Sequence, residues 1–137
     1  MSRWICPRCE REFARAHQSH VCVPGNTVDD VFRDRPPEQR EICEAIIGYL
    51  ESLGPIHVDA VKVGVFLKHE SKLAELRPKS KWLSLEIVLP RLVNDPRISR
   101  TIKIAADRIV HIVKLSDAGQ VDERVMQWLT EAYDAAS

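Results

Sequence analysis

The sequence is poor in glycine and in long apolar segments. Its five glycines are scattered through 137 residues, so it contains no glycine-rich loop that could enclose a phosphate group. No apolar run approaches the roughly 20 residues that cross a bilayer. Arg3, Cys6, Arg8 and Cys9 interrupt the N-terminal segment, which excludes the apolar centre of a signal peptide. We therefore expect a cytoplasmic protein with no membrane partner.

The sequence also lacks the residue patterns that are typical of an enzyme. No nucleophile stands at a characteristic spacing from a general base, and no pair of carboxylates stands out at helical spacing on an apolar face. Catalytic residues need not be neighbours in sequence. The sequence therefore favours a binding protein over an enzyme without deciding between them.

Net charge is zero, with 20 Lys and Arg against 20 Asp and Glu. The chain thus lacks the strong positive charge of a dedicated non-specific nucleic-acid binder. The charge is unevenly distributed, however. Residues 68–103 carry nine basic and four acidic side chains, whereas residues 25–67 carry four basic and eight acidic ones. A basic central stretch can contact nucleic acid or another anionic partner locally.

Three of the four cysteines lie within the first 22 residues. Cys6 and Cys9 form a C-x2-C pair, and His20 and Cys22 follow as H-x-C. Thiolates and imidazoles at such spacings are typical of tetrahedral zinc, and a site with four protein ligands has no open position. We therefore predict a structural Zn²⁺ bound by Cys6, Cys9, His20 and Cys22, which would fold a segment too small to have its own core.

His17 is an alternative ligand for the same metal. His17 and His20 are three residues apart and would share a helix face, whereas residues two apart do not. Residues 11–19 contain no helix breaker and predict about two helical turns, which would have to end before Cys22. We favour Cys22 because the third clustered thiol would otherwise have no role. Cys43 lies apart from this cluster on an apolar helix position, where a buried thiol is expected.

Three segments follow from these patterns: a zinc-binding module at 1–24, a linker with a short docking element at 25–36, and an α+β domain at 37–137. Apolar residues at i, i+3 and i+4 predict a helical turn over 27–33, capped by Thr27 or Asn26.

Two longer helices are expected in the α+β domain. Residues 38–53 and 121–135 repeat apolar side chains with a period of 3.6. Ser116 or Asp117 would cap the second helix, with Gln120 three residues after Asp117.

Short segments of alternating polarity separate the two helices. Their connections are too short for parallel crossovers, which need a dozen or more residues. We therefore predict an α+β fold in which two helices cover one face of an antiparallel meander of about five strands. The candidate strand segments are 56–61, 62–68, 73–77, 82–89, 100–104 and 109–114.

The predicted turn between two of these strands carries Arg77, Lys79, Lys81 and Trp82. Three cations beside an aromatic ring suit phosphate contact and base stacking. The alternative is an ordinary solvated hairpin turn with Trp82 folded into the core.

Arg108 and His111 are candidates for binding a small ligand in a cleft. His111 shares a strand face with Ile109 and Val113, because side chains two residues apart in a strand point the same way. A buried histidine with a structural role is therefore the alternative.

A series of motifs runs through nearly the whole chain: W-x-C-P-x-C at Trp4, Cys6, Pro7 and Cys9; R-x-F at Arg11 and Phe13; Q-x-H-x-C at Gln18, His20 and Cys22; V-D-D-x-F at Val28 to Phe32; Leu53-Gly54-Pro55; Arg77-Pro78-Lys79; and the end from Trp128 to Tyr133. In these motifs the chain resembles a bacterial family known as domain of unknown function 5655. The resemblance implies His20 rather than His17 as the ligand and a small α+β C-terminal domain. It implies no particular activity.

We expect a zinc-binding protein that acts as a binding module for nucleic acid or another protein. The alternative is a small-ligand-binding or enzymatic α+β domain, in which the zinc module is a structural cap. The sequence does not determine an oligomeric state.

Overall fold

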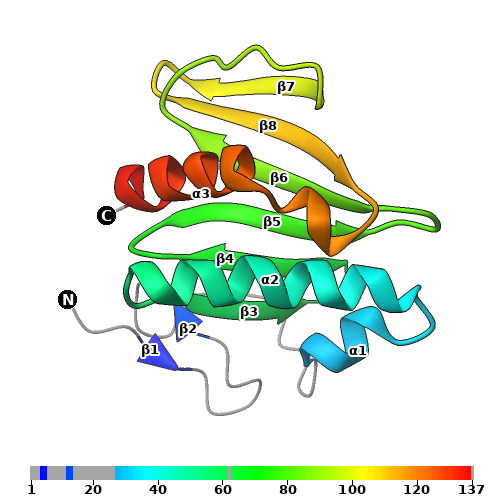
Figure 1. The fold of residues 1–137 in the computed structure, drawn as a ribbon. Helices are drawn as coiled ribbons and strands as arrows, with labels where there is room; N and C mark the ends of the chain where they lie inside the picture. The colour runs from blue at the N-terminus through cyan, green and yellow to red at the C-terminus, as the bar shows by residue number, and fades with distance from the viewer. Residues whose placement is uncertain (1–3, 6–11, 14–26, 62, 137) are drawn as a thin grey trace.

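Figure 1 shows the computed structural model, which describes residues 4–5, 12–13, 27–61 and 63–136. The main sheet has six antiparallel strands in the order β3-β4-β5-β6-β8-β7, and α2 and α3 lie across the same face of it. The elements are β1 (Trp4–Ile5), β2 (Glu12–Phe13), α1 (Val28–Phe32), α2 (Pro37–Leu53), β3 (His57–Val61), β4 (Gly64–Lys68), β5 (Lys72–Pro78), β6 (Leu83–Leu89), β7 (Ile98–Ala105), β8 (Arg108–Leu115), the 3-10 turn η1 (Ala118–Gln120) and α3 (Glu123–Ala135). The predicted α+β class is confirmed.

The predicted first long helix is confirmed as α2, which starts one residue earlier than expected. Pro37 occupies its first turn, where a missing N–H group is harmless. Ile42, Ile46 and Leu50 are fully buried against the sheet, as the 3.6 period requires. The helix ends before Gly54, which has a positive φ of 153°. The short turn α1 is also confirmed, with Thr27 as its N-cap.

The cap of α3 differs from the prediction. Asp117 and Gln120 do form a capping box, but it belongs to η1. The N-cap of α3 is Asp122, whose carboxylate accepts a hydrogen bond of 3.1 Å from the Val125 N–H. This hydrogen bond lowers the pKa of Asp122. The apolar pattern continues from η1 into α3. Periodicity alone therefore could not show that the helical chain is interrupted at Val121.

The meander prediction is correct for β3 to β6 and wrong for the last two strands. β8 lies between β6 and β7, with Leu85 of β6 opposite Val113 of β8. Alternate residues of β8 are buried, whereas every residue of β7 after Ile98 is exposed. The more apolar strand, β8, therefore takes the inner position beside β6. After β6 the chain follows residues 90–97 to the outer edge, forms β7 there, and then returns as β8.

The core lies between the helices and one face of the sheet. Alternate residues of each inner strand point toward the helices, as the strand period dictates. On β6 these are the fully buried Leu83, Leu85, Ile87 and Leu89. We refer to the side of the sheet away from α2 and α3 as the opposite face.

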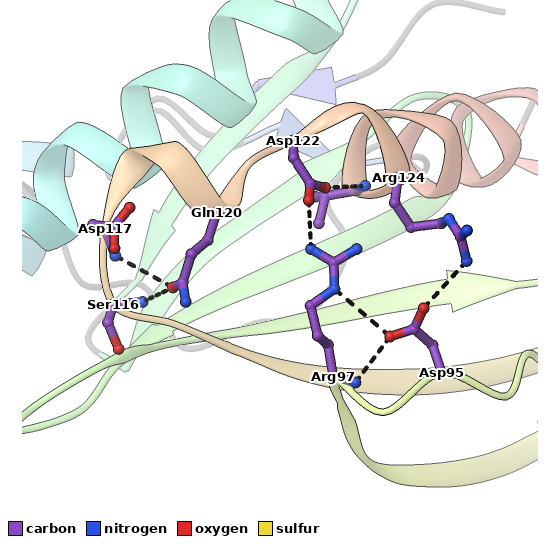
Figure 2. Close-up of polar contacts among 8 residues, drawn as sticks. Asp95, Arg97, Ser116, Asp117, Gln120, Asp122 and Arg124 are labelled. Atoms are coloured by element: carbon purple, nitrogen blue, oxygen red, sulfur yellow. Dashed lines mark hydrogen bonds and ion pairs between the residues drawn. The ribbon is translucent and has the colours of Figure 1, made fainter.

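An ion-pair network joins the segment before β7 to the start of α3 (Figure 2). Arg97 pairs with Asp122 at 2.8 Å, and Arg124 pairs with Asp95 at 3.2 Å. The Arg97 guanidinium also lies 5.4 Å from the centre of the Trp128 ring. These contacts hold the connection between β6 and β7 against α3.

The N-terminal part contains a two-stranded hairpin, in which Trp4 pairs with Phe13 and Ile5 with Glu12. The helical prediction for residues 11–19 is therefore wrong at β2. The predicted metal ligands Cys6, Cys9, His17, His20 and Cys22 lie outside the described residues. Within the part of the chain that the structure describes, no helix is long and apolar enough to span a membrane.

Two glycines provide a matched test of this fold. A Cβ atom on Gly64 would overlap the backbone carbonyl of Leu76 on the neighbouring strand, whereas nothing lies near a Cβ atom on Gly48 in α2. We expect Gly64→Ala to lower the free energy of unfolding by about 1–3 kcal/mol. Gly48→Ala should raise it by about 0.5–1 kcal/mol because alanine favours helix. Urea denaturation measures both, and a stabilising Gly64→Ala would contradict the strand packing.

Candidate nucleic-acid interface at the β5–β6 turn

The turn between β5 and β6 presents two lysines at one end of the sheet. The final strand pair is Pro78 opposite Leu83, and the Lys79 N–H donates a 2.8 Å hydrogen bond to the Trp82 carbonyl. This hydrogen bond closes the turn. Lys79 and Lys81 are exposed, and Trp82 is half-buried.

Gln39 in the first turn of α2 fixes the position of this turn. Its side chain is only 1% exposed, and its Nε2 atom donates hydrogen bonds to the carbonyls of Lys79 at 2.7 Å and Trp82 at 3.1 Å. The side-chain oxygen has no hydrogen-bond partner among the described residues. Two backbone carbonyls of the turn are therefore bound to a buried side chain, which orients the lysines outward.

Lys114 of β8 extends the same positive surface. Its Nζ atom lies 4.6 Å from the centre of the Trp82 ring, a distance typical of a cation–π contact. Lys79, Lys81 and Lys114 form no ion pair with any described carboxylate. We refer to these three side chains as the lysine cluster. Its charge is available to an anion from solution.

Arg77, the other cation predicted for this site, is already neutralised. Its guanidinium forms ion pairs with Glu75 and, at 3.1 Å, with Glu86. The hydrogen bond to Glu75 raises the pKa of Arg77 above its ordinary value. The structure thus brings together Lys79, Lys81 and Trp82 of the predicted set, with Arg77 committed elsewhere.

The opposite face of the sheet carries paired charges of both signs. Lys72 bonds to Glu75 at 3.0 Å and lies over the Phe66 ring, and Lys68 pairs with Asp59 at 3.3 Å. Glu75 is 4% exposed, so its two cationic partners offset the cost of burying its charge. The described cations of β4 and β5 on this face are therefore already paired, in contrast to the lysine cluster.

His111 is a buried structural residue, which was the alternative in the sequence. It is 0% exposed, and the Val93 N–H donates a 3.0 Å hydrogen bond to its Nε2 atom. The proton must then lie on Nδ1, which donates to the Ile109 carbonyl at 3.0 Å. Burial lowers the pKa of His111, so the imidazole is neutral and anchors the segment after β6.

Arg108 is exposed at the β7–β8 turn and does not meet His111 in a common cavity. It lines a cavity of about 350 Å³, whereas His111 is absent from the lining. The walls of the cavity are mixed, with Lys72, Asp107 and Arg108 beside Val88, Leu89 and three alanines.

Cys43 is buried in the core, and burial raises the pKa of its thiol to about 12. It is therefore a neutral thiol at ordinary pH. No group of three or more histidine, cysteine or acidic residues that could bind a metal occurs within the described ranges.

Gln39 and Lys114 were not predicted from the sequence. Gln39 falls on the buried stripe of α2, at i, i+3, i+4 and i+7 with Ile42, Cys43 and Ile46, and a polar residue in such a stripe indicates a specific hydrogen bond. Lys114 could be found only after β8 was known to pair directly with β6, because it lies opposite Ser84.

The buried state of His111 predicts a pH-dependent stability. The ordinary pKa of histidine is near 6.5. As the pH falls below it, His111 becomes protonated in the unfolded chain but stays neutral in the folded chain. Stability is therefore full above this pH and is lost as pH falls toward the lowered pKa, by at most about 1.4 kcal/mol per pH unit. Measured from pH 8 to pH 5, the stability advantage of the wild type over His111→Gln should shrink. His57 and His69 are present in both proteins and cancel, and a constant difference would contradict this account.

A comparison with protein families gives one match. The family model described as "Domain of unknown function (DUF5655)" matches residues 28–136, and residues 1–27, which carry the predicted zinc ligands, lie outside the match. No curated protein and no solved structure shows significant similarity to the chain. Because the match covers most of the chain and the whole six-stranded sheet, the chain belongs to the DUF5655 family.

Proposed function

We propose that this chain is a nucleic-acid-binding protein that contacts the phosphate backbone through the lysine cluster. The observation that carries the proposal is that two unpaired lysines lie on a turn that Gln39 holds in place, while a third, Lys114 of β8, lies over the Trp82 ring of that turn. Cations supply sequence-independent affinity for phosphates. A fixed turn increases the affinity because the backbone loses less conformational freedom when the lysines bind.

The geometry favours phosphate contact over base stacking. Lys114 lies over the Trp82 ring, so a base could stack on that side of the ring only if Lys114 moved. The three amine groups, by contrast, can reach phosphates without rearrangement. Three phosphate contacts give a salt dependence with a slope of about −2 on logarithmic axes for a single strand, which is a weak, general mode of binding.

A structural zinc ion at Cys6, Cys9, His20 and Cys22 is the second part of the proposal. The paired strands β1 and β2 support it, because Ile5 and Glu12, which flank segment 6–11 in the sequence, are paired. That segment carries both residues of the C-x2-C pair, and hairpins suit the placing of two thiolates on one metal. The metal would stabilise the N-terminal module and would take no part in chemistry.

A small-ligand site that uses both Arg108 and His111 is less well supported. Both ring nitrogens of His111 are engaged by backbone groups, and only Arg108 reaches the neighbouring cavity. A ligand could bind the His111 ring nitrogens only if these hydrogen bonds broke, whereas binding through the lysine cluster breaks none of them.

Charge reversal tests the nucleic-acid proposal. Fluorescence anisotropy with a labelled 20-nucleotide oligothymidylate should give a Kd that rises at least tenfold in Lys79→Glu/Lys81→Glu at low salt. For the wild type, raising the salt from 50 to 200 mM should weaken binding roughly 20-fold.

The matched control is Arg100→Glu/Lys103→Glu on β7, which changes the net charge by the same amount at exposed positions. Its Kd should stay within threefold of the wild-type value. An equal loss in both double variants would mean that only net charge matters, and no measurable binding by the wild type would refute the proposal.

Metal analysis tests the zinc proposal independently. After gel filtration, the purified chain should contain one zinc per molecule by mass spectrometry. Cys22→Ser should lose it because a thiolate ligand is removed, and His17→Ala should retain it. Zinc that is retained in Cys22→Ser and lost in His17→Ala would show that the ligand assignment is wrong.

A further inference from the structure

β7 is the outer strand of the sheet at the edge farthest from β3. Among the described residues it pairs with β8 alone, and Figure 1 shows that neither α2 nor α3 covers it. Every residue from Ser99 to Ala105 is exposed. A strand in this position presents unpaired N–H and C=O groups along one side, which can accept another strand.

The side chains of β7 add apolar surface to these backbone groups. Ile102 is 40% exposed and Ile104 is 60% exposed. They are two of only four large apolar residues that are exposed in the described ranges. Ile102 lies opposite the half-buried Val110 of β8, so the apolar surface continues onto the neighbouring strand.

The charge on β7 is of one sign. Arg100 and Lys103 are exposed, form no ion pair with a described carboxylate, and have no acidic neighbour between Ile98 and Ala105. We propose that the β7 edge binds a short, extended, acidic segment of a partner protein by strand addition. Main-chain hydrogen bonds would supply affinity, and the two cations would select acidic side chains.

A second copy of the chain fits this edge poorly. Pairing two β7 edges would bring Arg100 and Lys103 of both copies, four positive charges, into one short strand pair with no acidic side chain on either strand. Like charges repel, so this pairing is unfavourable. A nucleic acid would neutralise the cations but would leave the backbone groups and both isoleucines without partners.

Irregularities at both ends of the strand limit the length of the segment. Register shifts occur between Ile98 and Arg100 and between Lys103 and Ala105. Only Arg100 to Lys103 pair with β8 without interruption, so the complementary segment is short. Bulges and cations also deter neutral strands from pairing with such an edge, which makes acidic character the distinguishing feature of the partner.

The test uses the full chain and a fluorescein-labelled hexapeptide, Val-Glu-Val-Val-Glu-Val. Its two glutamates are three residues apart and therefore face opposite sides of the strand, as Arg100 and Lys103 do. We expect saturable binding that weakens at least tenfold in Arg100→Glu/Lys103→Glu and changes less than threefold in Lys79→Glu/Lys81→Glu. Amide hydrogen exchange within residues 98–105 should slow when the peptide is added, because strand addition protects backbone N–H groups. Thermal melts of both double variants establish that they are folded.

Three results would overturn the proposal. These are no binding of the acidic peptide, equal binding of a valine–lysine hexapeptide, and binding that leaves exchange in β7 unchanged. None of them bears on oligothymidylate binding at the lysine cluster, so the two proposals fail separately.

Discussion

Burial of one face of the sheet beneath α2 and α3 is the constraint on which the rest of the structure depends. Leu85 and Ile87 of β6 and Ile46 of α2 are fully buried in this layer, and such burial supplies most of the favourable free energy of folding. Because strand side chains alternate, the polar residues of the same strands must lie on the opposite face or at the strand ends. Paired charges lie on the opposite face of β3 to β6, and the lysine cluster lies at the end of the sheet where β5 turns into β6.

Gln39 connects this core to the candidate binding surface. It is a buried polar residue in an apolar helix stripe, and its two hydrogen bonds reach a turn some forty residues further along the chain. Buried polar groups cost free energy unless they are hydrogen-bonded, so this residue links the position of α2 to the conformation of the turn. The lysine cluster is thus presented by the core of the fold, and the edge of β7 lies outside the region that the helices cover.

Features set by local spacing could be predicted from the sequence, and features set by distant contacts could not. The buried stripe of α2 follows from a 3.6 period, and the alternation in β8 correctly placed His111 beside Val113. The position of β8 inside β7, however, depends on which strand buries more apolar surface in the core, a comparison that no local pattern contains. For the same reason Lys114 was not predicted, since its partner Trp82 lies near β6. Arg77 was predicted to be available for binding, although it pairs with Glu75 of its own strand and with Glu86 of β6. The zinc ligands remain a prediction from spacing.

The most direct test of the central claim is to map where a nucleic acid touches the folded protein. Oligothymidylate added to the ¹⁵N-labelled chain should shift the NMR amide resonances of residues 79–82 and of Lys114, and should leave those of residues 98–105 in place. The amide resonance of Gln39 should also respond, because its side chain is bonded to the turn. Shifts that centre on β7, or that spread evenly over every exposed cation, would contradict the account.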